Sequence, residues 1–217
     1  LATNGKFLGV APLGTSLTDD QAAQLREHGH RTPIVATDAD LAGRVAAERD
    51  YWILTPHGHD TRHAELPDGT DPADLVATGS AGVLAAALER ARPLADQLVD
   101  ERFAHLPASE AAVDALRVIA ASPPERWETG TQDVAERLRL PASLLRTALH
   151  ELVNAWNQDP RGSAAIALRD VTHVKTRLAH AEAVGVHERV TSRPGHTAAH
   201  PGDSPVPARA PSRGVDR

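Results

Sequence analysis

Residues 34–44 read IVATDADLAGR, a short apolar run followed by two aspartates and a glycine. A β-branched run that ends in polar residues and a glycine is typical of a strand leading into a helix. Alternate side chains of a strand share a face, so Asp38 and Asp40 would point the same way, about 7 Å apart. Two carboxylates at the end of a buried strand are costly unless a cation joins them. Mg²⁺ (or Mn²⁺) fits, because it binds through one or two carboxylates and leaves room for phosphate oxygens. Alternatively, Asp40 is only the N-cap of the following helix.

A second acidic segment supports the metal interpretation. Residues 66–75 read LPDGTDPADL and follow another predicted strand. In an open α/β sheet the carboxyl ends of the strands gather at one rim, where ligands bind. We therefore expect Asp71 to join Asp38 and Asp40 as a metal ligand. The alternative is a turn rich in proline and glycine with solvated acids.

The composition limits the classes of function. The chain has 217 residues, 41% of them apolar and 3% aromatic, enough for one domain with an appendage or for two small domains. It has no cysteine, which excludes disulfides, thiolate zinc sites and a cysteine nucleophile within this span. The net charge is −6, and acidic residues outnumber basic ones in residues 1–92 (13 to 8) and in residues 93–186 (13 to 10). The chain therefore lacks the basic face of a protein that binds nucleic acid by itself.

The sequence shows no run of 18 apolar residues and no signal peptide. We therefore expect a cytoplasmic protein without a membrane partner.

Around residues 34–44 the sequence predicts an α/β fold with a parallel sheet. Strands are expected at residues 6–10, 32–37 and 61–66, and helices after the capping box of Thr18 and at residues 41–54. Strand and helix alternate, which is the order of a parallel α/β unit. The histidines His57, His59 and His63 fall near the third strand, where we favour a solvated loop over a zinc site.

Beyond residue 72 the pattern becomes helical. Helices are expected at residues 74–92 with a break near Gly79, and at 93–103, 109–121, 131–138, 141–156 and 163–183. Residues 187–217 hold almost no large apolar side chain, so we expect a disordered tail. The expected organisation is therefore an α/β domain over residues 1–78, an all-helical region over 79–186 and a tail over 187–217.

Residues 131–157 form a candidate helix-turn-helix. In that interpretation Ser143 and Arg146 stand at the start of a recognition helix and contact DNA. The alternatives are an ordinary hairpin in a helical bundle and a docking site for a partner such as a helicase.

Three segments together resemble the TOPRIM domain of DnaG-type bacterial primases. They read GVAPLGTSLT at residues 9–18, TDADLAGR at 37–44 and LPDGTDPADL at 66–75, and the resemblance covers residues 1 to about 76. It implies a Rossmann-like domain that carries out Mg²⁺-dependent nucleotidyl transfer, making RNA primers in DNA replication or plasmid transfer. The implied partners are a single-stranded DNA template and nucleoside triphosphates. More loosely, the helices up to about residue 183 resemble the region that follows TOPRIM in actinobacterial primase-like proteins.

The resemblance also implies roles for individual residues. Asp38 and Asp40 would be catalytic and would bind the metal together with Asp71. Gly43 would allow close packing at the turn, and the remaining positions are nucleotide- or turn-associated: Gly14, Thr15 and Arg44.

The absence of one family motif keeps other functions open. The E-G-x-x-D motif that precedes these segments in the family is absent, so we expect the TOPRIM unit to lack its first strand and the primase to be incomplete in this chain. A degenerate, non-catalytic TOPRIM interaction module is one alternative. Strand cleavage by a TOPRIM nuclease or topoisomerase is another, but the only tyrosine, Tyr51, lies among apolar residues of a predicted helix.

Overall fold

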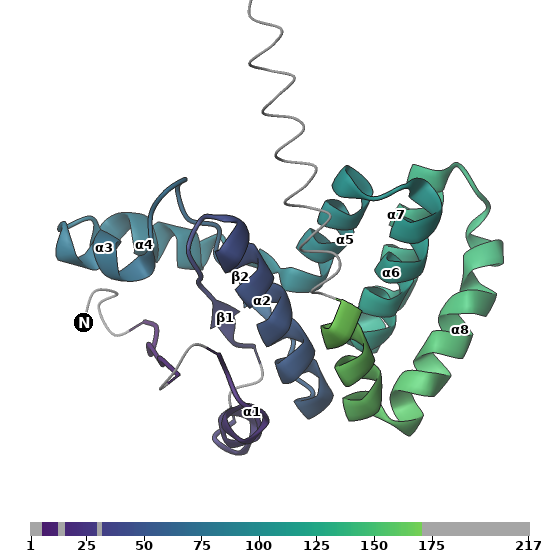
Figure 1. Cartoon of the computed structure of the whole chain (residues 1–217), viewed down its shortest axis with the longest axis horizontal. Helices are drawn as coiled ribbons and strands as arrows, with labels where there is room; N and C mark the ends of the chain where they lie inside the picture. The colour runs from purple at the N-terminus through teal and green to yellow at the C-terminus, as the bar shows by residue number, and fades with distance from the viewer. Residues whose placement is uncertain (1–5, 13–15, 30–31, 171–217) are drawn as a thin grey trace, which may run out of the picture.

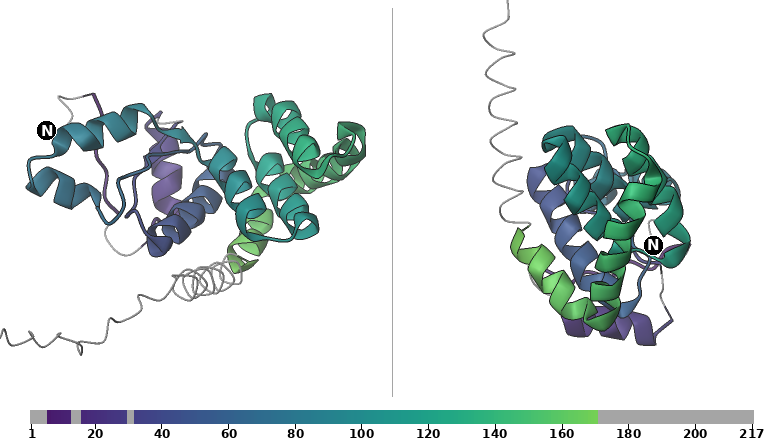
Figure 2. Two further views of the ribbon diagram at one scale, coloured as in Figure 1. Left: turned by 90° about the horizontal axis from the view of Figure 1, so that it is seen from above. Right: turned by 90° about the vertical axis from the view of Figure 1, so that its right-hand side faces the viewer.

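The computed structural model describes residues 6–12, 16–29 and 32–170 (Figure 1). A small sheet with helices α1 to α4 lies on one side, and helices α5 to α8 form a bundle beside it (Figure 1). Figure 2 shows the same two parts side by side from above. The expected combination of an α/β unit with a helical remainder is confirmed. Gly14, Thr15, residues 171–186 and the predicted tail lie outside the described residues.

The sheet has three short strands in the order β1-β2-β3. Strands β1 (Ile34–Val35) and β2 (Arg62–His63) are parallel, with Val35 opposite His63. This confirms the second and third predicted strands and their parallel pairing. Strand β3 (Arg92–Pro93) pairs antiparallel to β2, where the sequence predicted the end of a helix. Proline is tolerated there because β3 is an edge strand.

The strand expected at residues 6–10 is wrong. Residues 6–12 form no strand in the described structure, and Leu8 and Val10 are 74% and 64% exposed. A strand needs a neighbouring strand for its backbone hydrogen bonds, and no described segment forms a strand pair with these residues. The apolar residues of this segment were therefore not sufficient to predict a strand.

Helix ends in the α/β part follow local signals. Helix α1 (Asp19–Glu27) begins at the predicted capping box, in which Thr18 and Gln21 bond each other's backbone N–H groups. Helix α2 (Leu41–Leu54) has the predicted bounds and continues into the 3₁₀ turn η1 (Thr55–His57). The predicted break near Gly79 separates α3 (Pro72–Ala77) from α4 (Ala81–Glu89), and Gly79 has a φ of +75°, which glycine adopts readily.

The helical part contains the predicted helices with small shifts of their ends. They are α5 (Leu94–His105), α6 (Ala108–Ala121), α7 (Trp127–Leu138) and α8 (Ala142–Gln158), and a further helix is described from 160 to 170. Helix α7 starts four residues earlier than predicted, because the 3₁₀ turn η2 (Pro124–Arg126) leads straight into it. Among the residues placed in the structure, no helix combines the length and apolar character needed to cross a membrane.

One apolar core joins the α/β part to the helical part. It includes Ala22 of α1, Tyr51 and Trp52 of α2, Leu98 of α5 and Val118 of α6. The Tyr51 hydroxyl donates to the Val118 carbonyl over 2.9 Å. A second, smaller core lies under α3 and α4 and packs against the loop that follows β1. The position of that loop therefore depends on its packing against α3 and α4.

Candidate functional site

The loop between β1 and α2 carries the two aspartates. Asp40 is the N-cap of α2, and its Oδ1 accepts a hydrogen bond from the Gly43 N–H over 2.7 Å. Asp38 is exposed at the carboxyl end of β1. Capping occupies one lone pair of a carboxylate that has two oxygens and about four lone-pair positions, so it does not prevent Asp40 from binding a cation. The capping alternative is thus real and compatible with metal binding.

Gly43 lies directly against the backbone of Asp38. A Cβ at residue 43 would lie 1.9 Å from the Asp38 carbonyl oxygen and 2.9 Å from its nitrogen. Only glycine leaves room for this approach between the first turn of α2 and the loop. Gly43 therefore packs closely against this loop, and its role as a site residue stays a prediction.

The second acidic loop lies beside the first. The backbone N–H of Ala39 donates to the carbonyl of Thr70 over 3.2 Å, which brings Asp71 to the same edge of the sheet. Asp71 is the N-cap of α3, and its Oδ1 accepts from the Asp74 N–H over 2.7 Å. Both loops therefore end in an aspartate that starts a helix.

The electrostatics of this edge identify Asp74 as a further member. The negative charge of Asp71 and a hydrogen bond with it raise the pKa of Asp74, with smaller contributions from desolvation and from the charge of Asp38. Like charges held together disfavour ionisation and favour a bound cation. Nothing in the sequence distinguishes Asp74 from the other acids of this turn. Its place in the first turn of α3, which Asp71 caps, is what selects it.

A hard divalent cation fits this donor set. Within the described ranges no three histidine, cysteine or acidic side chains lie close enough together to hold a metal ion, so Asp38, Asp40 and Asp71 do not form a three-ligand group. Mg²⁺ does not need one, because it usually binds through one or two carboxylates and completes its shell with water and substrate phosphates. The all-oxygen acidic edge therefore suits Mg²⁺ or Mn²⁺ shared with a phosphate, and does not suit zinc.

The positive charge of Arg44 affects a carboxyl group of the neighbouring helix α5. Its positive charge lowers the pKa of Glu101 on α5, as does that of Arg102, but burial and the charge of Glu48 outweigh both and raise the pKa of Glu101 to about 7. A role for Arg44 at the acidic edge stays a prediction.

The raised pKa of Glu101 makes stability depend on pH. The folded-state pKa of Glu101, about 7, exceeds its ordinary value of 4.5. The folded protein is therefore most stable, as far as Glu101 is concerned, below pH 4.5, and it loses this stability as the pH rises through 7 and the buried carboxyl ionises. We expect the free energy of unfolding to fall by at most about 2 kcal/mol between pH 5 and pH 8 from this group. Urea denaturation at the two pH values should show a smaller fall of the free energy of unfolding in Glu101→Gln. An equal fall in the variant and the unaltered chain would show that another group titrates.

The interpretation of the three histidines as a solvated loop is wrong. His59 and His63 are 1% and 9% exposed, and the His57 side chain is 8% exposed. His57 Nε2 contacts Asp19 over 2.7 Å, and His59 Nε2 contacts the Ala22 carbonyl over 2.9 Å. Helices α1 and α5 cover this segment, which no local pattern could reveal. The histidines bind separate partners and form no common site.

The hairpin at residues 131–157 is present as α7 and α8, joined by a turn with Arg139 at a φ of +55°. Helix α8 buries Leu145 and Leu149 in the bundle, with Ser143 exposed near its start. The Arg146 guanidinium is bound by Glu128 of α7. This packing is that of a helical bundle, and DNA contact by Ser143 and Arg146 stays a prediction.

Tyr51 cannot serve as a nucleophile in this fold. It is 2% exposed, its hydroxyl donates to Val118, and burial raises its pKa. Because it is the only tyrosine, a tyrosine-dependent strand cleavage by these residues is disfavoured.

Comparison with known proteins agrees with this geometry. A family model described as Toprim-like matches residues 1–76. The DNA primase of Clostridium acetobutylicum is 34% identical over 94 residues, which is 43% of this chain and 16% of that primase. The DNA primase of Halalkalibacterium halodurans is 43% identical over 68 residues, 31% of this chain and 11% of that primase. The chain thus spans at most 16% of the length of these two relatives.

A solved structure of the DnaG primase catalytic domain bound to ssDNA is 29% identical to this chain, with a TM-score of 0.51. The match covers 61% of this chain and 45% of that domain, so it extends past residue 76 into the helical part. The two loops that carry Asp38 and Asp71 fall inside the span matched by the family model. Residues 1–76 therefore carry a Toprim-like domain that is similar to the TOPRIM domain of DnaG-type primases.

Proposed function

We propose that this chain supplies the divalent-metal-binding part of a DNA primase that joins nucleotides into an RNA primer. The observation that carries the proposal is the meeting of two acidic loops at one sheet edge, through the bond from Ala39 to Thr70, inside the Toprim-like span. Asp38 and Asp40 would bind the cation, with Asp71 as the third acid. Asp74 would join this set, since the charge of the neighbouring Asp71 raises its pKa and a cation would relieve that repulsion.

A bound Mg²⁺ would favour ionisation of the attacking hydroxyl and stabilise the pyrophosphate that leaves. The protein's own contribution would be to hold the carboxylates in place. The Gly43 N–H and the Asp74 N–H fix one oxygen each of Asp40 and Asp71. The site would thereby keep its acids oriented before a nucleotide arrives, which reduces the reorganisation needed for reaction.

The partners follow from the same proposal. A related primase domain has been solved with ssDNA, which supports a single-stranded DNA template here. With a net charge of −6, this chain would rely on cations at the acidic edge, or on another protein segment, to offset phosphate repulsion. We further propose nucleoside triphosphates as substrates, a helicase as a candidate partner of the helical part, and a cytoplasmic location.

A non-catalytic interaction module is the second candidate. It is favoured by the fact that Asp40 and Asp71 both cap helices, a structural role that explains the two acids without a metal. The two candidates differ in whether the acidic edge binds a cation and a nucleotide.

Substitution of Asp38 separates them. In calorimetric titration with Mg²⁺, we expect Asp38→Asn to lose metal binding, while its stability stays equal or rises because repulsion between carboxylates is relieved. Glu125→Gln, at an exposed acid of η2, is the matched control and should bind Mg²⁺ like the unaltered chain. Loss of the fold in Asp38→Asn would instead assign Asp38 a structural role.

Nucleotide binding gives the second measurement. We expect the unaltered chain to bind a nucleoside triphosphate only when Mg²⁺ is present, and Asp38→Asn not to bind it. Absence of both Mg²⁺ and nucleotide binding in the unaltered chain would favour the interaction module. Metal-dependent cutting of single-stranded DNA would favour the nuclease alternative.

A further inference from the structure

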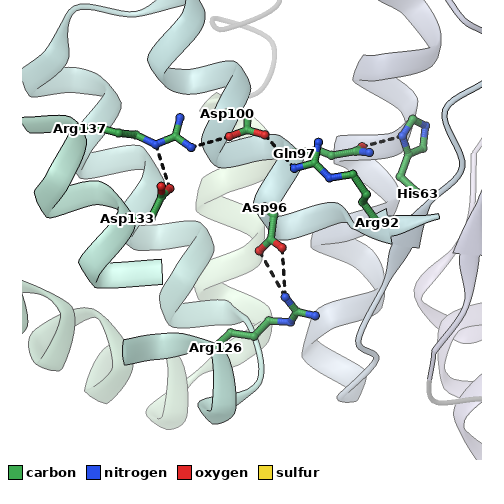
Figure 3. A network of polar contacts seen from close by, with 8 residues as sticks. All are labelled: His63, Arg92, Asp96, Gln97, Asp100, Arg126, Asp133 and Arg137. Carbon is green, nitrogen blue, oxygen red and sulfur yellow. Dashed lines mark hydrogen bonds and ion pairs between the residues drawn. The ribbon is translucent and has the colours of Figure 1, made fainter. Parts of the chain in front are cut away.

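His63 lies between the acidic loop and the helical part. It is on β2, directly opposite Val35 of β1, and is 9% exposed. Its Nδ1 lies 2.7 Å from Oε1 of Gln97 on α5, and its Nε2 lies 3.4 Å from the Thr37 hydroxyl. Figure 3 shows the ring directed at Gln97 across the gap between the strand and α5.

The partners fix the protonation of the ring. The Gln97 oxygen can only accept, so Nδ1 of His63 carries the proton and donates it. The Nε2 atom then accepts from the Thr37 hydroxyl. Burial lowers the pKa of His63, which agrees with a neutral ring at pH 7. The imidazole thus joins a side chain of the loop after β1 to a side chain of α5.

Each end of this connection is held. Thr37 directly precedes Asp38, so fixing its side chain restricts the backbone that aims the Asp38 carboxylate. On the other side, α5 is tied to the bundle by two ion pairs, Asp96 with Arg126 at 3.3 Å and Asp100 with Arg137 at 2.6 Å (Figure 3). The bundle therefore offers a fixed point to which His63 can anchor the loop.

We propose that His63 is a positioning residue, which holds the Asp38 loop at a set distance from α5 through Thr37 on one side and Gln97 on the other. This inference rests on the proposed function, because it assumes that the loop binds a divalent cation. Residues that orient metal ligands from outside the coordination sphere commonly change metal affinity by one to two orders of magnitude. His63 acts here through Thr37 and does not itself bind the metal.

Five substitutions test the connection. His63→Phe keeps a ring and removes both hydrogen bonds, and Thr37→Val removes only the hydroxyl while leaving His63 and α5 in place. Thr37→Ser restores the hydroxyl. In His63→Gln the amide reaches the place of Nε2 and retains the Thr37 contact, whereas in His63→Asn it reaches the place of Nδ1 and retains the Gln97 contact.

Two measurements on the full chain are informative. The first is the affinity for Mn²⁺ alone, followed by electron paramagnetic resonance. We expect it to fall roughly tenfold in His63→Phe, Thr37→Val and both amide variants, and to recover in Thr37→Ser. The second is hydrogen exchange of the amides of residues 36–40, which should speed up roughly tenfold in the same four variants. His105→Phe, at an exposed histidine near the end of α5, is the control and should change neither.

The outcomes separate this inference from the proposed function. The role of His63 would be overturned if Thr37→Val and His63→Gln left both hydrogen exchange and Mn²⁺ affinity unchanged. If Asp38→Asn still lost Mn²⁺ binding in that case, the metal site would remain supported. Faster exchange in a chain that never binds Mn²⁺ would support anchoring of the loop and overturn the proposed function.

Discussion

Gly43→Ala is expected to destabilise the protein by about 2 kcal/mol, although alanine forms helices better than glycine by about 1 kcal/mol. The added Cβ would lie 1.9 Å from the Asp38 carbonyl oxygen and 2.8 Å from its carbon, and these are backbone atoms that cannot rotate away. Either α2 or the loop must move. We expect the loss to be seen in urea denaturation, together with a weaker response to Mg²⁺, because the movement displaces Asp38.

Gly82→Ala provides the matched control. Gly82 also lies in the first turn of a helix, α4, but a Cβ there meets nothing within 4 Å. This substitution should leave stability unchanged or raise it by up to about 1 kcal/mol, since the unfolded chain loses freedom. Equal stability of the two variants would contradict the close approach between α2 and the Asp38 loop.

Arg102→Met is expected to have the largest effect on stability, a loss of about 3–5 kcal/mol. Arg102 of α5 and Glu48 of α2 are each 4% exposed, and the guanidinium Nη2 donates to Glu48 Oε1. The Trp52 indole N–H donates to the same oxygen over 3.3 Å. Removing Arg102 leaves the Glu48 charge buried without its cation. The loss should appear in urea denaturation as a lower midpoint with an unchanged slope.

The double variant distinguishes the cause. Glu48→Gln combined with Arg102→Met removes both charges, so most of the loss should be recovered, because a neutral buried amide costs far less than a buried carboxylate. If the double variant is as unstable as Arg102→Met alone, lost packing of the arginine stem explains the effect instead.

This ion pair is adjacent to a small polar cavity. The cavity is about 20 Å³, enough for one water, and Arg102 and Glu48 line it together with Asp114, Arg117 and Asp170. Among the described residues, Arg102 Nη1 is buried without a hydrogen-bond partner, and Nε has only the 3.9 Å approach of Asp114. Helices α2, α5, α6 and the helix over 160–170 therefore meet around charge as well as around apolar side chains.

Local signals predicted several elements and the acidic loops correctly. The Thr18 capping box marks the start of α1, and Gly79 marks the break between α3 and α4. The geometry of such helix ends depends on near neighbours alone. The same holds for Asp40 at the start of α2, which needs only the N–H of Gly43. Conversely, the strand expected at residues 6–10 failed because a strand depends on a neighbour that no local pattern reports.

The order of apolar runs, caps and turns by itself indicated the α/β unit, the helical remainder and the acids that follow the strands, because caps, turns and hydrophobic periodicity depend on residues within a few positions. The parallel pairing of β1 with β2 is a tertiary contact. The tertiary structure alone decided that His63 is buried between Thr37 and Gln97, that Glu48 meets Arg102, and that Gly43 touches Asp38. The hydrogen bonds of His63 with Thr37 and Gln97 and of Arg102 with Glu48 join residues 26, 34 and 54 positions apart. Whether such side chains are solvated or buried is set by the packing of α5 against α2 and the sheet, and burial is what turns a common residue into one that positions its neighbours.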